Sequence, residues 1–154
     1  MERRQISGRE SIWEYPKTPV IRPAARHVRV IHDGICVART DRPIQMCEMG
    51  HPPTYYIPPE DVRVELLEPN DHQTFCEWKG IAHHLDLTVG TTRVEDIAWY
   101  YPEPNRDYDS ICDFIAFYPD RLDTCLVDGE EAAPEPNPFY GGWITSDILG
   151  PFER

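Results

Sequence analysis

The sequence predicts a mainly β domain of the β-rich α+β class, built as a compact antiparallel β-barrel or as two bent sheets. Proline supplies 16 of the 154 residues, about a tenth, where about 5% is ordinary. Because proline lacks an N–H group and disfavours helical geometry in the residue before it, this composition argues against a helical fold. Short alternating apolar and polar runs also follow one another closely, as in small antiparallel proteins.

Two hairpins organise these runs. The dipeptide Asp33-Gly34 favours a tight turn between the first two runs. The strongest hairpin pairs residues 72–79 with residues 83–89 through Gly80. The predicted strands span residues 27–31, 35–38, 44–48, 50–59, 61–66, 72–79, 83–89 and 93–101, with a turn at 68–71.

One helical pattern interrupts the strands, near residues 107–117. There Ile111, Phe114 and Ile115 recur at the spacing of one helix face, which predicts a short helix. We divide the chain into an N-terminal extension (1–26), a β-rich core (27–127), and an acidic proline-rich linker with an aromatic tail (128–154). The tail is too apolar to be free, so we expect it to dock on the core or on a neighbouring chain.

The charge distribution limits the partners. The chain has 27 acidic and 15 basic residues, a net charge of −12. Nucleic acids and anionic membranes attract basic surfaces, so we expect neither as a partner. The extension is the exception, with six basic and three acidic residues, 6 − 3 = +3. Such an arm suits an acidic body or a partner subunit.

The expected location is the cytoplasm. The first residues lack the apolar core of a signal peptide, and no run approaches the length of a membrane span. The five cysteines are odd in number and irregularly spaced. Such spacing fits reduced thiols better than a disulfide framework.

Three segments, residues 48–56, 72–80 and 99–101, concentrate polar and aromatic side chains on neighbouring predicted strands. An apolar aromatic cavity with a few polar groups is typical of a small-molecule site, although the same rings also build cores. The candidate catalytic residues are Lys79, Cys76, His72 and Glu48. The candidate ligand-binding residues are His51, Tyr55, Tyr56, Trp99 and Tyr101.

Lys79 is the most distinctive of these candidates, because only one other residue, Lys17, is a lysine. An ammonium group can anchor a carboxylate or a phosphate, or form a Schiff base where it is desolvated. It can equally pair with one of the many carboxylates. A turn before Gly80 would bring Lys79 close to Cys76, whose thiolate it would favour. Glu48 or a histidine could then act as general base.

Metal binding has weaker support. Residues four apart on a strand share a face but lie about 13 Å apart, too far for one ion. We therefore assign no metal ligand and infer no cofactor, and a zinc-stabilised domain remains an alternative. The cysteine and histidine pairs considered are Cys47 with His51, His72 with Cys76, and His83 with His84.

Several motifs together resemble the family catalogued as domain of unknown function 427. They are Glu48-x-Gly50-His51-Pro52-Pro53-x-Tyr55-Tyr56-Ile57-Pro58, Asp71-His72-x-Thr74-x-Cys76-x-x-Lys79-Gly80-x-Ala82, Ala98-Trp99-x-Tyr101-x-x-Pro104, Ala116-Phe117-Tyr118 and the tail Phe139-Tyr140-Gly141-Gly142-Trp143-Ile144-Thr145. The resemblance covers roughly residues 27–152 and implies a small β-rich domain with no established biochemical role. This chain departs from the family at Glu77, where proline is usual, and at His84, where tyrosine is usual.

The family is sometimes labelled nucleotidyltransferase-like. The sequence gives that label no support, since it has no glycine-rich phosphate loop and no acidic pair placed for two magnesium ions. Three functions therefore stay open. The first is a domain that binds or acts on an unidentified small molecule. The second is a structural module, in which the arm and tail wrap a neighbour in a symmetric homodimer. The third is a zinc-stabilised domain.

Overall fold

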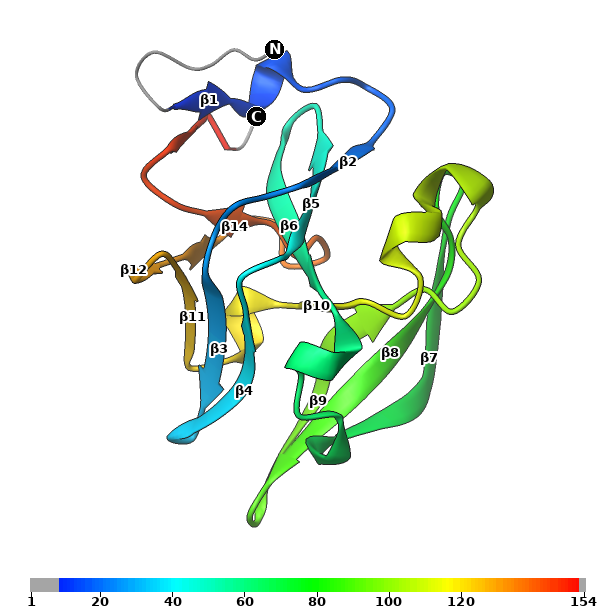
Figure 1. The fold of residues 1–154 in the computed structure, drawn as a ribbon, viewed down its shortest axis with the longest axis vertical. Coiled ribbons are helices and arrows are strands. Elements are labelled where there is room, and N and C mark those ends of the chain that lie inside the picture. Colours follow the sequence, from blue (N-terminus) through cyan, green and yellow to red (C-terminus); the bar gives the residue numbers. More distant parts are fainter. Residues whose placement is uncertain (1–8, 153–154) are drawn as a thin grey trace.

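The computed structural model describes residues 9–152 and confirms a mainly β fold (Figure 1). Its largest sheet has seven strands, each antiparallel to its neighbours, in the order β2-β5-β6-β10-β9-β8-β7. In that order the strands are Val20–Pro23, Ile44–Glu48, His51–Ile57, Ile115–Phe117, Thr92–Tyr100, Gly80–Val89 and Leu67–Cys76.

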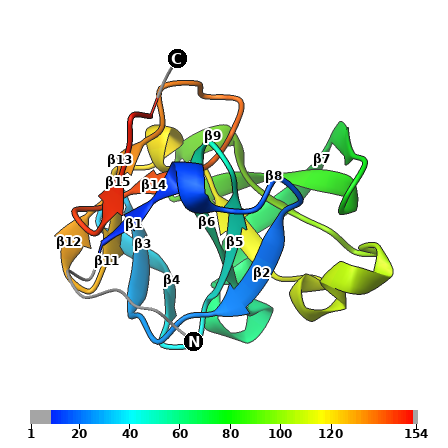
Figure 2. The ribbon, with the colours of Figure 1, turned by 90° about the horizontal axis from the view of Figure 1, so that it is seen from above.

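A second, four-stranded sheet has the order β12-β11-β3-β4, again with antiparallel neighbours. Its strands are Glu130–Glu131, Thr124–Val127, Val28–His32 and Ile35–Thr40. Two short pairs complete the fold: β1 (Glu10–Ser11) with β15 (Ile148–Leu149), and β13 (Ala133–Pro134) with β14 (Trp143–Ile144). Figure 2 shows β3, β4 and β11 on one side and β7 on the other, with β5 and β6 between them.

The main sheet does not close into a barrel. Its edge strands β2 and β7 do not pair with each other within residues 9–152. Of the two predicted architectures, two bent sheets is therefore the one adopted. No helix in this range is long and apolar enough to cross a membrane.

The helix expected near 107–117 is a 3-10 helix, η4 (Arg106–Ile111), followed by strand β10. Asp113 lies between them with a φ of 64°, which ends any helical path. Residues 115–117 are all buried because β10 lies between β6 and β9 in the middle of the sheet. The other 3-10 helices are η1 (Ile12–Glu14), η2 (Pro59–Asp61), η3 (Val64–Leu66) and η5 (Pro119–Arg121).

Two further local predictions are wrong. The strand predicted at 61–66 is mostly 3-10 turn: Val62 is buried in the core but forms only an isolated bridge to Ala38, and Val64, two residues on, is 48% exposed. The turn predicted at 68–71 lies inside β7, where the pairing with β8 shifts register.

The two faces of the main sheet have different partners. One face packs on the four-stranded sheet through a core that includes Val30, Tyr55 and Phe117. The other face carries a second cluster that includes Tyr56, Trp99 and Tyr101. Tyr55 and Tyr56 fall on opposite sides because successive side chains of a strand alternate.

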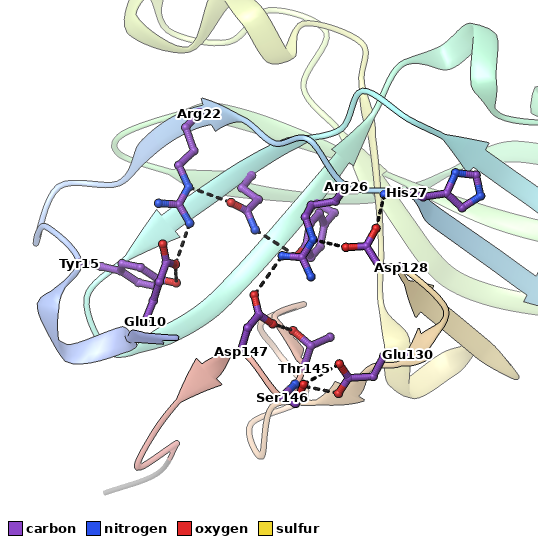
Figure 3. Close-up of polar contacts among 12 residues, drawn as sticks. Glu10, Tyr15, Arg22, Arg26, His27, Asp128, Glu130, Thr145, Ser146 and Asp147 are labelled. Carbon is purple, nitrogen blue, oxygen red and sulfur yellow. Dashed lines mark hydrogen bonds and ion pairs between the residues drawn. The ribbon is translucent and has the colours of Figure 1, made fainter. Parts of the chain in front are cut away.

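Residues from both ends of the described chain form what we call the arm–tail junction (Figure 3). Its members are Glu10, Tyr15, Arg22, Arg26, Asp128, Thr145 and Asp147. Arg22 donates to Glu10 (2.7 Å), and Arg26 pairs with Asp128 (2.6 Å) and Asp147 (3.0 Å). The basic extension thus bonds to acidic groups of its own chain as far as it is described, and β2 within it is an edge strand of the main sheet. Residues 1–8 of the extension lie outside the described residues.

Candidate functional site

A cavity of about 400 Å³ opens on the face of the main sheet that carries the second cluster. Its wall is formed by residues of β5 to β9 and of the β7–β8 loop, by residues at η5, and by the tail after β13. The predicted candidates that line it are Glu48, His51, Tyr56, His72, Cys76, Lys79, Trp99 and Tyr101. The remaining candidate, Tyr55, is not among the lining residues.

Tyr55 belongs to the structural side of the sheet. It is 1% exposed, and its ring lies 5.0 Å from that of Trp143 in the core. Its hydroxyl accepts a hydrogen bond from Gln45, which in turn accepts one from Arg22 of the arm–tail junction. Tyr55 therefore links the junction to the core instead of reaching the cavity.

The β7–β8 hairpin places Cys76 and Lys79 together in the cavity. Cys76 pairs with Gly80 across the hairpin, so residues 77–79 form the connecting loop. Gly80 has a φ of 115°, and an added Cβ would lie 3.3 Å from the carbonyl oxygen of Glu103. The loop is held by Asn105, which donates to the carbonyl oxygens of Trp78 (2.7 Å) and Lys79 (2.9 Å). A side-chain-bearing residue at position 80 would disturb this geometry.

The Lys79 ammonium has no ion pair and no hydrogen bond to any of residues 9–152. It lies 5.9 Å from the centre of the Tyr101 ring, within cation–π range. Burial alone would lower the pKa of Lys79, but the electrostatic influence of Tyr56, Cys76 and Glu48 outweighs it and raises that pKa. Lys79 is therefore a cation at neutral pH, which suits anchoring an anion and disfavours a Schiff-base role.

Aromatic rings form the apolar wall beside Lys79. Tyr56 and Trp99 meet edge to face at 6.1 Å, and the Trp99 indole N–H donates to the Tyr56 hydroxyl (3.1 Å). Tyr118 packs on Trp99 at 4.5 Å. Burial raises the pKa of Tyr101 well above its ordinary value, so its hydroxyl stays protonated. The wall offers flat apolar surface with hydroxyl groups at its edges.

A histidine–carboxylate pair lies on the tail side of the cavity. Nδ1 of His51 is 3.1 Å from Glu135 Oε2, and the backbone N–H of Gly142 donates to Glu135 Oε1 (2.9 Å). An ionised carboxylate only accepts, so Nδ1 donates and Nε2 of His51 is left to accept a proton. The ring of Tyr140 lies 4.4 Å from that of His51. The contact with Glu135 thus fixes the orientation of the His51 ring at the cavity.

A second histidine group lies toward β9. His72 and His84 stack at 4.1 Å, and Nδ1 of His72 lies 3.2 Å from Asp96 Oδ2. The Thr74 hydroxyl shares a hydrogen bond of 3.1 Å with Nε2 of His84. Burial, and after it the charge of His72, lowers the pKa of His84 to about 4, so this ring is neutral at pH 7.

Sequence reasoning did not identify some cavity residues. Glu135 was assigned to a surface linker, yet it is 6% exposed. The sequence feature that could have indicated Glu135 is the Gly141-Gly142 pair, because neither position has room for a side chain. An added Cβ would overlap with Trp99 Cη2 at Gly141 and would lie 2.5 Å from Glu135 Oε1 at Gly142. Further lining residues that were not among the site candidates include His84, Asp96, Tyr118 and Arg121.

The fold and the cavity define a mainly β domain with an aromatic-walled cavity on one sheet face. The chain belongs to the family described as Domain of unknown function (DUF427), whose model matches residues 20–128. This confirms the predicted family. The matched range holds every lining residue except those from the tail, namely Glu135, Phe139, Tyr140 and Gly141. None of the curated proteins compared with the sequence matches it.

Proposed function

We propose that the cavity binds a compact small molecule with a flat apolar body and one anionic group. The observation that carries the proposal is the Lys79 ammonium, which lies among aromatic rings with no anionic partner in the described chain. A cavity of about 400 Å³ falls within the range of about 300–1,000 Å³ that small-molecule sites usually occupy. A flat ligand would pack on Trp99 and Tyr101 while its anion meets Lys79.

Exposed aromatic side chains at the cavity support an apolar ligand body. Phe75 is 75% exposed, Trp78 39%, Phe139 63% and Tyr140 44%, and all four line the cavity. Large exposed apolar groups that gather in one place mark interaction sites. Two come from the β7–β8 hairpin and two from the tail, so a ligand would be contacted from both sides.

The charge of the lining argues for a single negative group. Two fixed cations, Lys79 and Arg121, stand against four carboxylates, which gives 2 − 4 = −2. A nucleoside triphosphate would meet net repulsion in such a cavity. The nucleotidyltransferase-like label therefore finds no support in the lining.

The test uses benzoate as the probe and benzamide as its neutral counterpart. Binding to the full chain is followed by NMR shifts of the Trp99 indole N–H. We expect benzoate to bind more tightly than benzamide, and Lys79→Met to weaken benzoate binding at least tenfold, about 1.4 kcal/mol. Lys17→Met is the matched control, because Lys17 is exposed on the arm. Equal binding of the two probes, or an unchanged affinity in Lys79→Met, would contradict the proposal.

The other functions have less support. The described arm and tail bond to their own chain, which makes an exchange of these segments in a homodimer unnecessary. All five cysteines are free thiols, as expected in a reducing compartment, so the cytoplasm is the proposed location. Cys76 lines the cavity and is half-buried, and a catalytic use of its thiol remains secondary to ligand binding.

A further inference from the structure

Three side chains that can ligate a metal meet at the β9 side of the cavity, one from each of three adjacent strands. One ring nitrogen of His72, one of His84 and one carboxylate oxygen of Asp96 lie within 4.8 Å of one another. We infer that this cluster binds one divalent transition-metal ion, of the class of zinc or iron(II), with open coordination positions toward the cavity. The inference does not rest on the anion-binding function.

Two irregularities in the sheet create the cluster. Three residues of β7, 70–72, lie opposite the single residue His84 of β8. Three residues of β9, 95–97, lie opposite the single residue Asp86. Such bulges redirect side chains and are frequent beside active sites. They bring His72 and Asp96 to His84 from both neighbouring strands.

Asp96 adopts a backbone conformation that needs an explanation. Its φ is 56°, in the left-handed region. This conformation is uncommon for a residue other than glycine, and residues in sparsely populated backbone regions cluster at functional sites. Here it holds the carboxylate beside both histidines.

Outer contacts orient two of the three side chains, as outer partners do around metal ligands. Asn70 donates to Asp96 Oδ1 (2.6 Å), and its own oxygen accepts from the backbone N–H of His72 (2.7 Å). Thr74 holds Nε2 of His84 (3.1 Å). Two of the three ligand candidates therefore have an oriented ring or carboxylate before any ion arrives.

His84 supplies an independent observation. The residue is 2% exposed, and its Nδ1 is buried with no hydrogen-bond partner among residues 9–152. Buried polar atoms nearly always have a partner, so an orphan in a cavity wall points to a missing one. A ring nitrogen with a free lone pair is what a transition metal takes.

The chemistry of the set selects the class of ion. Two imidazoles and one carboxylate suit zinc or non-haem iron, whereas calcium and magnesium prefer oxygen ligands. Three protein ligands with an open position are typical of catalytic rather than structural zinc sites. A divalent cation would also offset the lining charge of −2.

The geometry requires a small closure. Ligand atoms around one tetrahedral zinc ion lie about 3.3 Å apart, given bonds of about 2.0–2.1 Å. The separation within the cluster is up to 4.8 Å. The His72 side chain is 49% exposed, so it has room to turn toward an ion.

The test measures metal binding by the full chain after EDTA treatment and dialysis. Zn²⁺ alone is titrated by calorimetry, and Co²⁺ is added as a visible probe of the coordination shell. The variants are His72→Ala and Asp96→Asn; asparagine tolerates the left-handed backbone, so the second removes charge without disturbing the chain. His83→Ala is the matched control, because His83 neighbours His84 but packs on Tyr100 (5.7 Å).

We expect one Zn²⁺ per chain in the natural protein and in His83→Ala, with affinity at least about tenfold weaker in both ligand variants. Thermal unfolding of each variant verifies that it is folded. The inference is overturned if the folded protein shows no saturable Zn²⁺ binding, or if His72→Ala and Asp96→Asn bind as tightly as His83→Ala. Lys79→Met should retain the metal, so failure of the anion-binding function would appear separately.

Discussion

The arm–tail junction and the cavity contain the same kinds of side chain but pair them differently. In the junction Arg22 meets Glu10 at 2.7 Å, and Arg26 meets both Asp128 and Asp147. In the cavity the Lys79 ammonium forms no ion pair within the part of the chain that the structure describes. One region closes its charges on itself, while the other leaves a charge available to a ligand.

The difference extends to neutral polar groups. The Thr145 hydroxyl of the junction donates to Asp147. In the cavity wall, Thr54 Oγ1 and His84 Nδ1 are buried without a partner in residues 9–152. Because satisfied polar groups add stability and unsatisfied ones subtract from it, the junction serves the fold. The cavity carries a burial cost at these two atoms, which hydrogen bonds or coordination from an occupant would offset.

Trp143 packs on Tyr55, which links the junction to the core, and it follows Gly141 of the cavity lining by two residues, so its removal should affect both regions. It is 0% exposed, packs on Tyr55, and donates from its indole to the carbonyl oxygen of Phe117 (3.1 Å). We expect Trp143→Ala to lower the free energy of unfolding by about 3–5 kcal/mol, measured by urea denaturation. A loss below about 1 kcal/mol would show that the tail is not part of the core.

Gly141→Ala should change the cavity and leave the arm–tail junction unchanged, because Gly141 lines the cavity. Its Cβ would overlap with Trp99 Cη2, so the indole, which lines the cavity, must shift. We expect a loss of about 1–3 kcal/mol in unfolding free energy, as for other overpacked sites. Benzoate binding should weaken as well. Ala132→Gly is the control, because Ala132 is buried in the core and does not line the cavity. It should lower the stability without changing benzoate binding. Gly34→Ala is unsuitable, because the φ of 77° at Gly34 would itself strain an alanine.

Strand alternation and the predicted hairpin account for most of the candidate residues that line the cavity. The hairpin through Gly80 placed Cys76 and Lys79 together, and pairing along β5, β6 and β9 added the aromatic wall. Alternation could not decide between Tyr55 and Tyr56, because both are buried and only the register chooses which faces the core. It also missed Asp96, whose position depends on a bulge and a left-handed backbone.

Longer-range contacts account for the rest. Glu135 meets His51 across 84 residues of chain, and a run of acidic residues and prolines gives no sign of such a contact. The predicted helix failed for a similar reason: residues 115–117 are needed between two other strands, and this tertiary requirement overrides a helical spacing.

Acid should weaken the junction through Asp128. Burial would raise the pKa of Asp128, but hydrogen bonds from the His27 N–H and from Arg26 outweigh it and lower that pKa. Its stabilisation is therefore complete above the unfolded pKa of about 3.9 and is lost as pH falls through the lower folded pKa. We expect Asp128→Asn to cost about 0.5–1 kcal/mol at pH 7, a modest value because the side chain is 49% exposed.

The matching measurement is urea unfolding of both proteins at pH 7 and at a series of lower pH values that passes through the unfolded and then the folded pKa of Asp128. The difference between them should vanish in acid. A difference that persists at low pH would assign the role of Asp128 to the geometry of its hydrogen bonds with His27 and Arg26 rather than to its charge.

The smallest effect should come from Thr54→Val, and its contrast with Thr145→Val tests the comparison directly. Thr54 Oγ1 has no partner in residues 9–152, so a methyl group of the same shape removes a burial cost, and we expect unchanged stability or a gain of up to about 1 kcal/mol. Thr145→Val removes a hydrogen bond to a carboxylate and should cost about 1–2 kcal/mol. Urea denaturation of the two variants side by side decides the matter. Equal losses of unfolding free energy would mean that both hydroxyls stabilise the fold. A gain in Thr54→Val with a loss in Thr145→Val would indicate that the Thr54 hydroxyl is kept for contact with a ligand.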